Sequence, residues 1–226
     1  MRTTKFGIEI EMTGITRSKA AEVLLTLLGG RSKYTGGVYS TYEITAPDSR
    51  KWKLMSDASI KCEKKGNGRK IEADKDYSVE LVSPILTYNR DIETIQEIIR
   101  RLRKAGAHTN SSCGIHIHLN GSNHNARSIR NFINIIASKN DLFYKALDIA
   151  PERVFYCKEL DKQLVDKMNK KKPKTLDNLS NIWYHINEDN RGLSQTSHYH
   201  SSRYHFLNLH SFFTRNHTVE LRGYAQ

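Results

Sequence analysis

The chain has 226 residues, of which 38% are hydrophobic and 27% are charged, and its formal net charge is +12. This length suits one sizeable hydrophobic core, and no apolar run approaches the roughly 18 residues of a membrane span. The N-terminus also lacks the apolar core of a signal peptide, so we expect a cytoplasmic protein that does not contact a membrane. Three scattered cysteines, Cys62, Cys113 and Cys157, argue against a disulfide framework or a cysteine zinc site and fit a reducing cytosol.

The positive charge favours polyanionic partners, such as nucleic acid, phosphorylated substrates or acidic polymers. Part of the charge lies in two runs, "RRLRK" at 100–104 and "NKKKPK" at 169–174. We interpret the first as the outer face of an amphipathic helix and the second as a solvated loop. Charge alone leaves nucleic-acid binding open, but no recognition motif supports it.

Hydrophobic periodicity predicts the elements of the first half. Apolar and polar residues alternate over residues 4–13, which predicts a strand, and the pattern over residues 17–28 predicts a helix that ends at Gly29-Gly30. Short β segments follow over 34–86, and "KGNG" at 65–68 predicts a hairpin turn. A helix over 89–105 ends before Gly106.

The second half begins with a strand, "GIHIHLN", and continues with a long helix over 125–149. A polar and basic segment with short helices covers about 150–200, and two strands, "RYHFLNL" and "HTVELRG", close the chain. No repeat and no linker interrupts this order. We therefore predict one α+β domain over residues 1–226 with a mostly antiparallel sheet.

Four of these strands place ionisable side chains opposite an apolar face. Successive side chains of a strand point to opposite faces, so the alternating apolar residues put the others together on one side. The residues on that side are Glu9 and Glu11 of "GIEIEM", Glu80 of "SVELVSP", His116 and His118 of "CGIHIHLN", and Glu220 and Arg222 of "TVELRG". If the strands share one sheet, helices cover one face and these groups gather on the other.

Acids and imidazoles that converge in this way need cations to offset their repulsion. Carboxylate oxygens with an imidazole suit Mg²⁺ or Mn²⁺, whereas structural zinc would require more Cys or His. The arginine beside them implies an anion, most simply a phosphate held by metal and guanidinium together. Because the carboxylates repel one another, we expect Glu9→Gln or Glu220→Gln to leave the stability of the metal-free protein unchanged or to raise it.

The order of "GIEIEM", "SDASI", "VELVSP", "CGIHIH", "RYHFLNL" and "TVELRG" resembles the amidoligase family. That family belongs to the carboxylate–amine ligase superfamily, with glutamine synthetase and γ-glutamylcysteine synthetase. The resemblance runs from residue 6 to residue 223. It implies a glutamine-synthetase-like catalytic domain, in which a curved antiparallel sheet has helices on one face and, on the other, two or three Mg²⁺ or Mn²⁺ ions that bridge the phosphates of ATP.

Residue by residue, the resemblance assigns the metal ligands to two groups. Glu9, His116 and Glu220 would hold the metal on the nucleotide side. Glu11 and Glu80, helped by Asp57 of "SDAS", would hold the metal or metals that face the carboxylate substrate. Asp57 is also suited to deprotonate the incoming amine, and both roles stay open.

The resemblance assigns the phosphate or acyl-phosphate contacts, as catalytic and cofactor-binding groups, to His118, Arg203 and Arg222. A more weakly matched segment, "ERVFYC", contains Arg153, Tyr156 and Cys157. For Cys157 we prefer the interpretation as a small buried hydrophobic residue.

The implied activity is ATP-dependent amide formation: a carboxylate accepts the γ-phosphoryl group and an amine attacks the acyl phosphate, giving an amide, ADP and phosphate. The carboxylate could belong to an amino acid, a peptide or a protein side chain, and the amine could be ammonia, an amino acid, a polyamine or a lysine. The net charge makes an acidic polymer or peptide attractive as one partner.

Two other functions each explain part of this pattern. A metal-dependent hydrolase or phosphoesterase would use the same acids, but "HIHLNGSNH" matches the metallo-β-lactamase motif H-x-H-x-D-H loosely, since Asn120 replaces the aspartate and His124 lies too far along. A basic nucleic-acid-binding module without catalysis explains the charge but not the acids on the strands. Binding of Mg-ATP separates the ligase from both.

Overall fold

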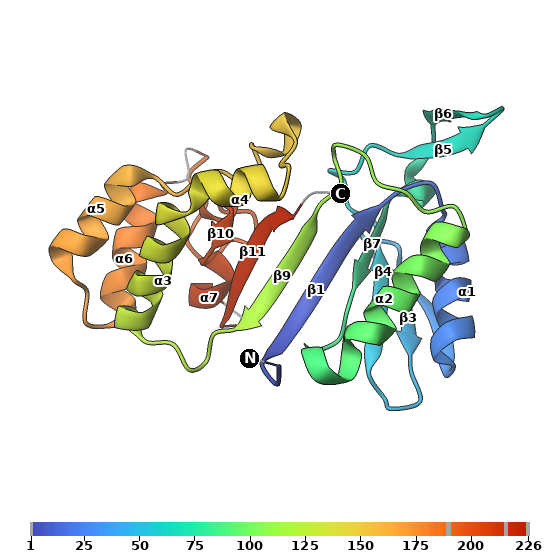
Figure 1. Ribbon diagram of the computed structural model, residues 1–226, viewed down its shortest axis with the longest axis horizontal. Coiled ribbons are helices and arrows are strands. Elements are labelled where there is room, and N and C mark those ends of the chain that lie inside the picture. Colours follow the sequence, from blue (N-terminus) through green and yellow to red (C-terminus); the bar gives the residue numbers. More distant parts are fainter. Residues whose placement is uncertain (1, 189–190, 215–216, 225–226) are drawn as a thin grey trace. The chain divides into compact units, whose positions relative to one another are not determined.

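The computed structural model describes residues 2–188, 191–214 and 217–224 (Figure 1). They divide into two compact units, the first reaching to Ile117 and the second running from His118 to Tyr224. Both units combine helices with antiparallel strands, so the prediction of an α+β protein with a mostly antiparallel sheet is confirmed. The single domain and the glutamine-synthetase-like fold stay predictions.

The first unit consists mainly of strands. Its elements are β1 (Lys5–Met12), α1 (Arg17–Leu28), β2 (Arg31–Gly36), β3 (Thr41–Thr45), β4 (Lys51–Met55), β5 (Glu63–Gly66), β6 (Arg69–Glu72), β7 (Val79–Val82), β8 (Leu86–Thr87), α2 (Tyr88–Lys104) and the first residues of β9 (Ile115–Asn120). The strand order of its sheet is β9-β1-β7-β4-β3-β2, and β8 also pairs with β1. Strands β5 and β6 form a separate hairpin.

The alternation of β1 and β7 determines which face of this sheet is apolar. Ile10 and Leu81 are buried in one core with Leu24 of α1 and Ile98 of α2, so both helices cover that face. Strands β1 and β7 are antiparallel, and their register places Glu11 opposite Glu80. The acidic side chains therefore lie together on the face away from this core.

Two local predictions in this unit are confirmed. Helix α1 spans the predicted residues, because the Thr16 side chain accepts a hydrogen bond from the amide of Lys19 and Gly29, with φ of 71°, ends it. The turn between β5 and β6 has Asn67 at φ 48° and Gly68 at φ 76°. Two left-handed residues in a row are what a tight hairpin turn requires.

The second unit consists mainly of helices. Its elements are the end of β9, α3 (Ala126–Ser138), α4 (Asn140–Ala146), α5 (Lys162–Lys171), α6 (Leu176–Ile186), β10 (Leu207–Asn208), α7 (His210–Thr214) and β11 (Thr218–Tyr224). Its strand order is β10-β11-β9. A second core joins Ile133 of α3, Met168 of α5 and Trp183 of α6. No helix among the described residues combines the length and apolar character needed to cross a membrane.

Three predictions in this unit were wrong in part. The long helix over 125–149 is two helices, because Lys139, at φ −121°, leaves helical geometry between α3 and α4. The run "NKKKPK" is not simply a loop, since α5 continues to Lys171 and ends at the left-handed Lys172 just before Pro173. Of "RYHFLNL", only Leu207–Asn208 forms a strand with β11.

The second unit contains a buried polar cluster, formed by Tyr184 of α6, His200 and Ser202 from the segment before β10, and His210 of α7. Nδ1 of His210 lies 2.9 Å from the hydroxyl oxygen of Tyr184, and Nδ1 of His200 lies 2.9 Å from Oγ of Ser202. Burial lowers the pKa of His210 to about 4, with a smaller contribution from the neighbouring His200. Burial also raises the pKa of Tyr184 to about 12, so both groups are neutral at pH 7.

We expect His210 to make the fold sensitive to mild acid. The unfolded chain takes up this proton near pH 6.5 and the folded chain only near pH 4, so stability is lost as pH falls through that window. Between pH 7 and pH 5 the loss is about 2 kcal/mol. Urea denaturation should show this difference shrinking in His210→Gln and persisting in His185→Gln, where the ring is exposed. An unchanged pH dependence in His210→Gln would contradict the assignment.

Candidate functional site

The first unit brings the predicted acids of β1, of β7 and of the turn after β4 together with the His116 imidazole of β9. Two groups of residues each place one ligand atom per residue within 4.8 Å of the others. The first group is Glu9, Glu80 and His116, and the second is Glu11, Asp57 and Glu80. Glu80 contributes to both groups, so its carboxylate lies between two candidate metal positions.

Hydrogen bonds fix the orientation of these side chains. Nδ1 of His116 lies 3.1 Å from Oε2 of Glu9, and Nε2 lies 3.7 Å from Oε1 of Glu11. Oε2 of Glu11 accepts the amide proton of Gly114 at 2.6 Å. Glu11 and His116 are 2% and 3% exposed, so their polar atoms face one another in a site with little water.

Asp57 reaches this group from the turn that follows β4. Its Oδ1 accepts the amide proton of Ser59 at 2.6 Å, which fixes the carboxylate in a local turn. The hydroxyl of Ser78 accepts the amide proton of Asp57 at 2.9 Å and donates to its carbonyl at 2.7 Å. The segment "SDAS" is therefore anchored to the residue just before β7.

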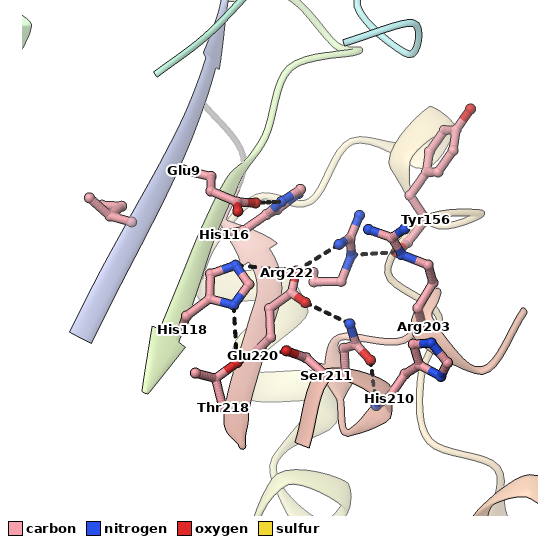
Figure 2. A network of polar contacts seen from close by, with 12 residues as sticks. Glu9, His116, His118, Tyr156, Arg203, His210, Ser211, Thr218, Glu220 and Arg222 are labelled. Carbon is pink, nitrogen blue, oxygen red and sulfur yellow. Dashed lines mark hydrogen bonds and ion pairs between the residues drawn. The ribbon is translucent and has the colours of Figure 1, made fainter. Parts of the chain in front are cut away.

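In the second unit, Glu220 lies at the centre of a buried polar network (Figure 2). Arg222 donates from Nη1 to Oε1 of Glu220 at 2.6 Å, and Asn208 donates from Nδ2 to Oε2 at 2.6 Å. Nε2 of His118 lies 3.9 Å from Oε1 of Glu220, and its Nδ1 lies 3.5 Å from the hydroxyl of Thr218. Glu220 and Arg222 are 3% and 6% exposed. Both oxygens of this carboxylate thus already accept hydrogen bonds.

The other predicted residues of this unit have different surroundings. Arg203 donates to the carbonyl of His198 at 2.8 Å and is half-buried. Cys157 is fully buried, its thiol donates to the carbonyl of Arg153, and burial raises the pKa of the thiol. These features support the interpretation of Cys157 as a small buried residue. The prediction of one site shared by all the strands stays a prediction, because the residues divide between the two units.

Sequence analysis missed Asn208. Its register partner in β11 is Glu220, and its Oδ1 accepts the amide proton of His210 at 2.8 Å. The signal was present, since "LNL" puts one amide between two leucines that go to the core. A polar side chain so placed must find a partner when it is buried.

We expect Asn208→Leu to destabilise the protein by about 1–3 kcal/mol, because it removes the buried donor to Oε2 of Glu220. Urea denaturation measures the loss. The control is Asn134→Leu, which removes two hydrogen bonds with the exposed Asn169 and one to the carbonyl of Arg130. Because these bonds lie near solvent, it should change stability by only about 0.5 kcal/mol. In a double-mutant cycle, the effect of Asn208→Leu should shrink when Glu220 is already glutamine. Strictly additive effects would contradict the pairing.

Comparison with known proteins identifies the family. A family model described as "putative amidoligase enzyme" matches residues 2–225. No curated protein and no solved structure gives a match. Since the family model covers nearly the whole chain, including every residue described above, the protein belongs to the amidoligase family, whose enzymes form amide bonds.

Proposed function

We propose that the protein is an ATP-dependent carboxylate–amine ligase that uses Mg²⁺ or Mn²⁺ and proceeds through an acyl phosphate. An amidoligase acts on a carboxylate and an amine, and an unactivated carboxylate resists attack by an amine. The observation that carries the proposal is the pair of ligand groups in the first unit that share Glu80. One shared carboxylate between two oxygen-rich positions is the arrangement expected of a two-metal site.

The donor chemistry of these residues fits the proposed ions. Glu9, Glu11, Asp57 and Glu80 offer carboxylate oxygens, and His116 offers a single ring nitrogen. Hard oxygen donors suit Mg²⁺ and Mn²⁺, and the absence of a cysteine from both groups disfavours structural zinc. When bound, the ions would neutralise the phosphate oxygens and raise the electrophilicity of the γ-phosphorus.

Groups of the second unit fit the phosphate contacts. The guanidinium of Arg222 is held by Glu220 at Nη1 and by the carbonyl of Tyr156, which accepts from Nε at 3.4 Å. A guanidinium fixed in this way would lose little side-chain entropy on contact with a phosphate. His118 and Arg203 complete the proposed set of donors toward the transferring phosphoryl group.

The proposed reaction has two steps. A carboxylate oxygen of the substrate forms a bond to the γ-phosphorus of ATP, and the bond from that phosphorus to the bridging oxygen breaks, so ADP leaves. The amine nitrogen then bonds to the acyl carbon, the carbon–oxygen bond breaks, and phosphate leaves with one oxygen of the original carboxylate. The amine loses a proton in this step, and Asp57 is the proposed acceptor if it is not a metal ligand.

The substrates themselves are proposed only by class. The net charge of +12 favours an acidic peptide or polymer as the carboxylate partner, because it speeds the encounter with polyanions. The structure also places lysines in the last turn of α5 and in the residue after it, which are exposed to solvent. We therefore propose to include acidic peptides in any substrate screen.

The test uses a carboxylate substrate labelled with ¹⁸O. The protein is incubated with ATP, Mg²⁺ and pools of amino acids, acidic peptides and amines, and mass spectrometry identifies the products. We expect ADP, a new amide and phosphate that carries one ¹⁸O, all dependent on metal. AMP with pyrophosphate would indicate adenylation instead. Metal-dependent cleavage of a phosphoester or amide without nucleotide would indicate a hydrolase.

A further inference from the structure

Three aromatic rings gather on the surface of the second unit. Phe155 and Tyr156 come from the segment after α4, and Tyr204 comes from the segment before β10. Their ring centroids lie 5.3 Å apart for Phe155 and Tyr156, 6.1 Å for Phe155 and Tyr204, and 6.0 Å for Tyr156 and Tyr204. Phe155 is 61% exposed, although two aromatic partners adjoin its ring. We call these three residues the aromatic shelf.

Backbone hydrogen bonds hold the shelf in place. The amide of Lys158 donates to the carbonyl of Tyr204 at 3.0 Å, and the amide of Phe206 donates to the carbonyl of Lys158 at 2.8 Å. The amide of Arg222 in turn donates to the carbonyl of Phe206 at 2.9 Å. These hydrogen bonds fix the segments that supply the rings relative to β11. Such a surface loses little conformational entropy when it binds a ligand.

Cations surround the shelf. The ammonium of Lys158 lies 5.0 Å from the ring centroid of Phe155, and the guanidinium carbon of Arg203 lies 5.8 Å from that of Tyr204. Arg222 reaches the shelf through its hydrogen bond to the carbonyl of Tyr156 (Figure 2). The rings are tilted against one another, with interplanar angles of 87°, 73° and 31°, so Phe155 offers the exposed aromatic surface. An exposed ring with the cations of Lys158 and Arg203 nearby matches a ligand that is aromatic at one end and anionic at the other.

We propose that the aromatic shelf binds the base of a purine nucleotide, while the cations beside it contact the phosphates. This inference rests on the proposed function, because it takes ATP as the nucleotide and assigns its base to residues that the metal argument leaves out. Bases stack on exposed protein rings irrespective of sequence, and one such ring accounts for a sizeable part of the affinity. An aliphatic or purely acidic ligand would not use both features.

The test compares two polyanions, so that binding of the base can be distinguished from binding of the phosphates. Isothermal titration of the full chain with Mg²⁺ measures the affinity of ATP and of inorganic tripolyphosphate, which lacks the nucleoside. In Phe155→Ala we expect ATP to bind about tenfold more weakly and tripolyphosphate to bind as before. Phe155→Leu, which keeps apolar volume but loses the flat ring, should behave in the same way. The control is Tyr199→Ala, which removes another ring, 52% exposed, from outside the shelf.

The possible outcomes are distinguishable. If Phe155→Ala leaves ATP affinity unchanged, or weakens both ligands equally, the shelf does not bind the base, and the ligase proposal stands. If the unaltered protein binds neither ATP nor tripolyphosphate, both the shelf and the ATP-dependent mechanism are wrong. If Phe155→Ala weakens the binding of ATP alone, and Tyr199→Ala binds both ligands as the unaltered protein does, the result supports binding of the base by the shelf.

Discussion

Glu80→Gln should lower amide formation by about 10³-fold and abolish the stabilisation of the protein by divalent cations. Glu80 supplies a ligand atom to both groups of the first unit, so its loss affects two candidate metal positions at once. A neutral amide oxygen is a much poorer partner for Mg²⁺ than a carboxylate. The measurements are the rate of ADP and amide formation and the midpoint of thermal unfolding during titration with Mg²⁺ or Mn²⁺.

The same variant should be no less stable than the parent without metal. Glu80 lies directly opposite Glu11 in the β1–β7 pair, and like charges in that position destabilise a sheet. We therefore expect the metal-free melting temperature to stay level or rise. Glu72→Gln is the matched control, because Glu72 lies exposed on β6 of the same unit and belongs to neither ligand group. A Glu80→Gln protein that unfolds readily without metal would show that the carboxylate is structural.

The acidic face of the first unit could be predicted from the sequence, because it depends only on the alternation of apolar and polar residues within each strand. In "GIEIEM" and "SVELVSP" every second residue is apolar, and that pattern alone assigns Glu9, Glu11 and Glu80 to the other face. The pairing of Glu11 with Glu80 was not accessible. It depends on the register of β1 against β7, which pairs Glu11 with a residue 69 positions later in the chain, and no local signal specifies that register.

The second unit shows where local signals fail. Helices α3 and α4 separate at Lys139 without a glycine or proline, so periodicity predicted one helix across the break. In "RYHFLNL", His205 forms a bridge with Lys158, and only the last part pairs with β11. Tertiary contacts decide both cases. They also place Asn208 against Glu220, a partner that the sequence-based interpretation overlooked.

The buried polar network around Glu220 changes one expectation that rested on charge repulsion. Sequence analysis predicted that Glu220→Gln would leave metal-free stability level or higher, as for Glu9. In the structure, Glu220 accepts hydrogen bonds from Arg222 and Asn208 and is 3% exposed. Removal of one partner from a buried ion pair costs about 3–5 kcal/mol. We now expect Glu220→Gln to lower the metal-free melting temperature, opposite in sign to Glu80→Gln.

Arg222→Lys should lower the rate of ADP formation by about 10²-fold, although the positive charge is kept. An ammonium can replace one hydrogen bond but cannot reach Glu220 and the carbonyl of Tyr156 together, as the guanidinium does. The proposed contact with the transferring phosphoryl group also needs planar donors in a fixed orientation. Steady-state kinetics should therefore show a fall in kcat that exceeds any change in KM for ATP.

Stability must be measured beside the rate, because the lysine also weakens a buried pair. We expect Arg222→Lys to remain folded with a loss of about 1–3 kcal/mol, since the charge of Glu220 keeps a partner. Arg127→Lys in α3 is the control, as its side chain is exposed in the same unit. If Arg222→Lys forms ADP as fast as the parent, the arginine serves only to hold Glu220. If the rate falls about 10²-fold while most of the stability is retained, the planar guanidinium acts on the phosphoryl group itself.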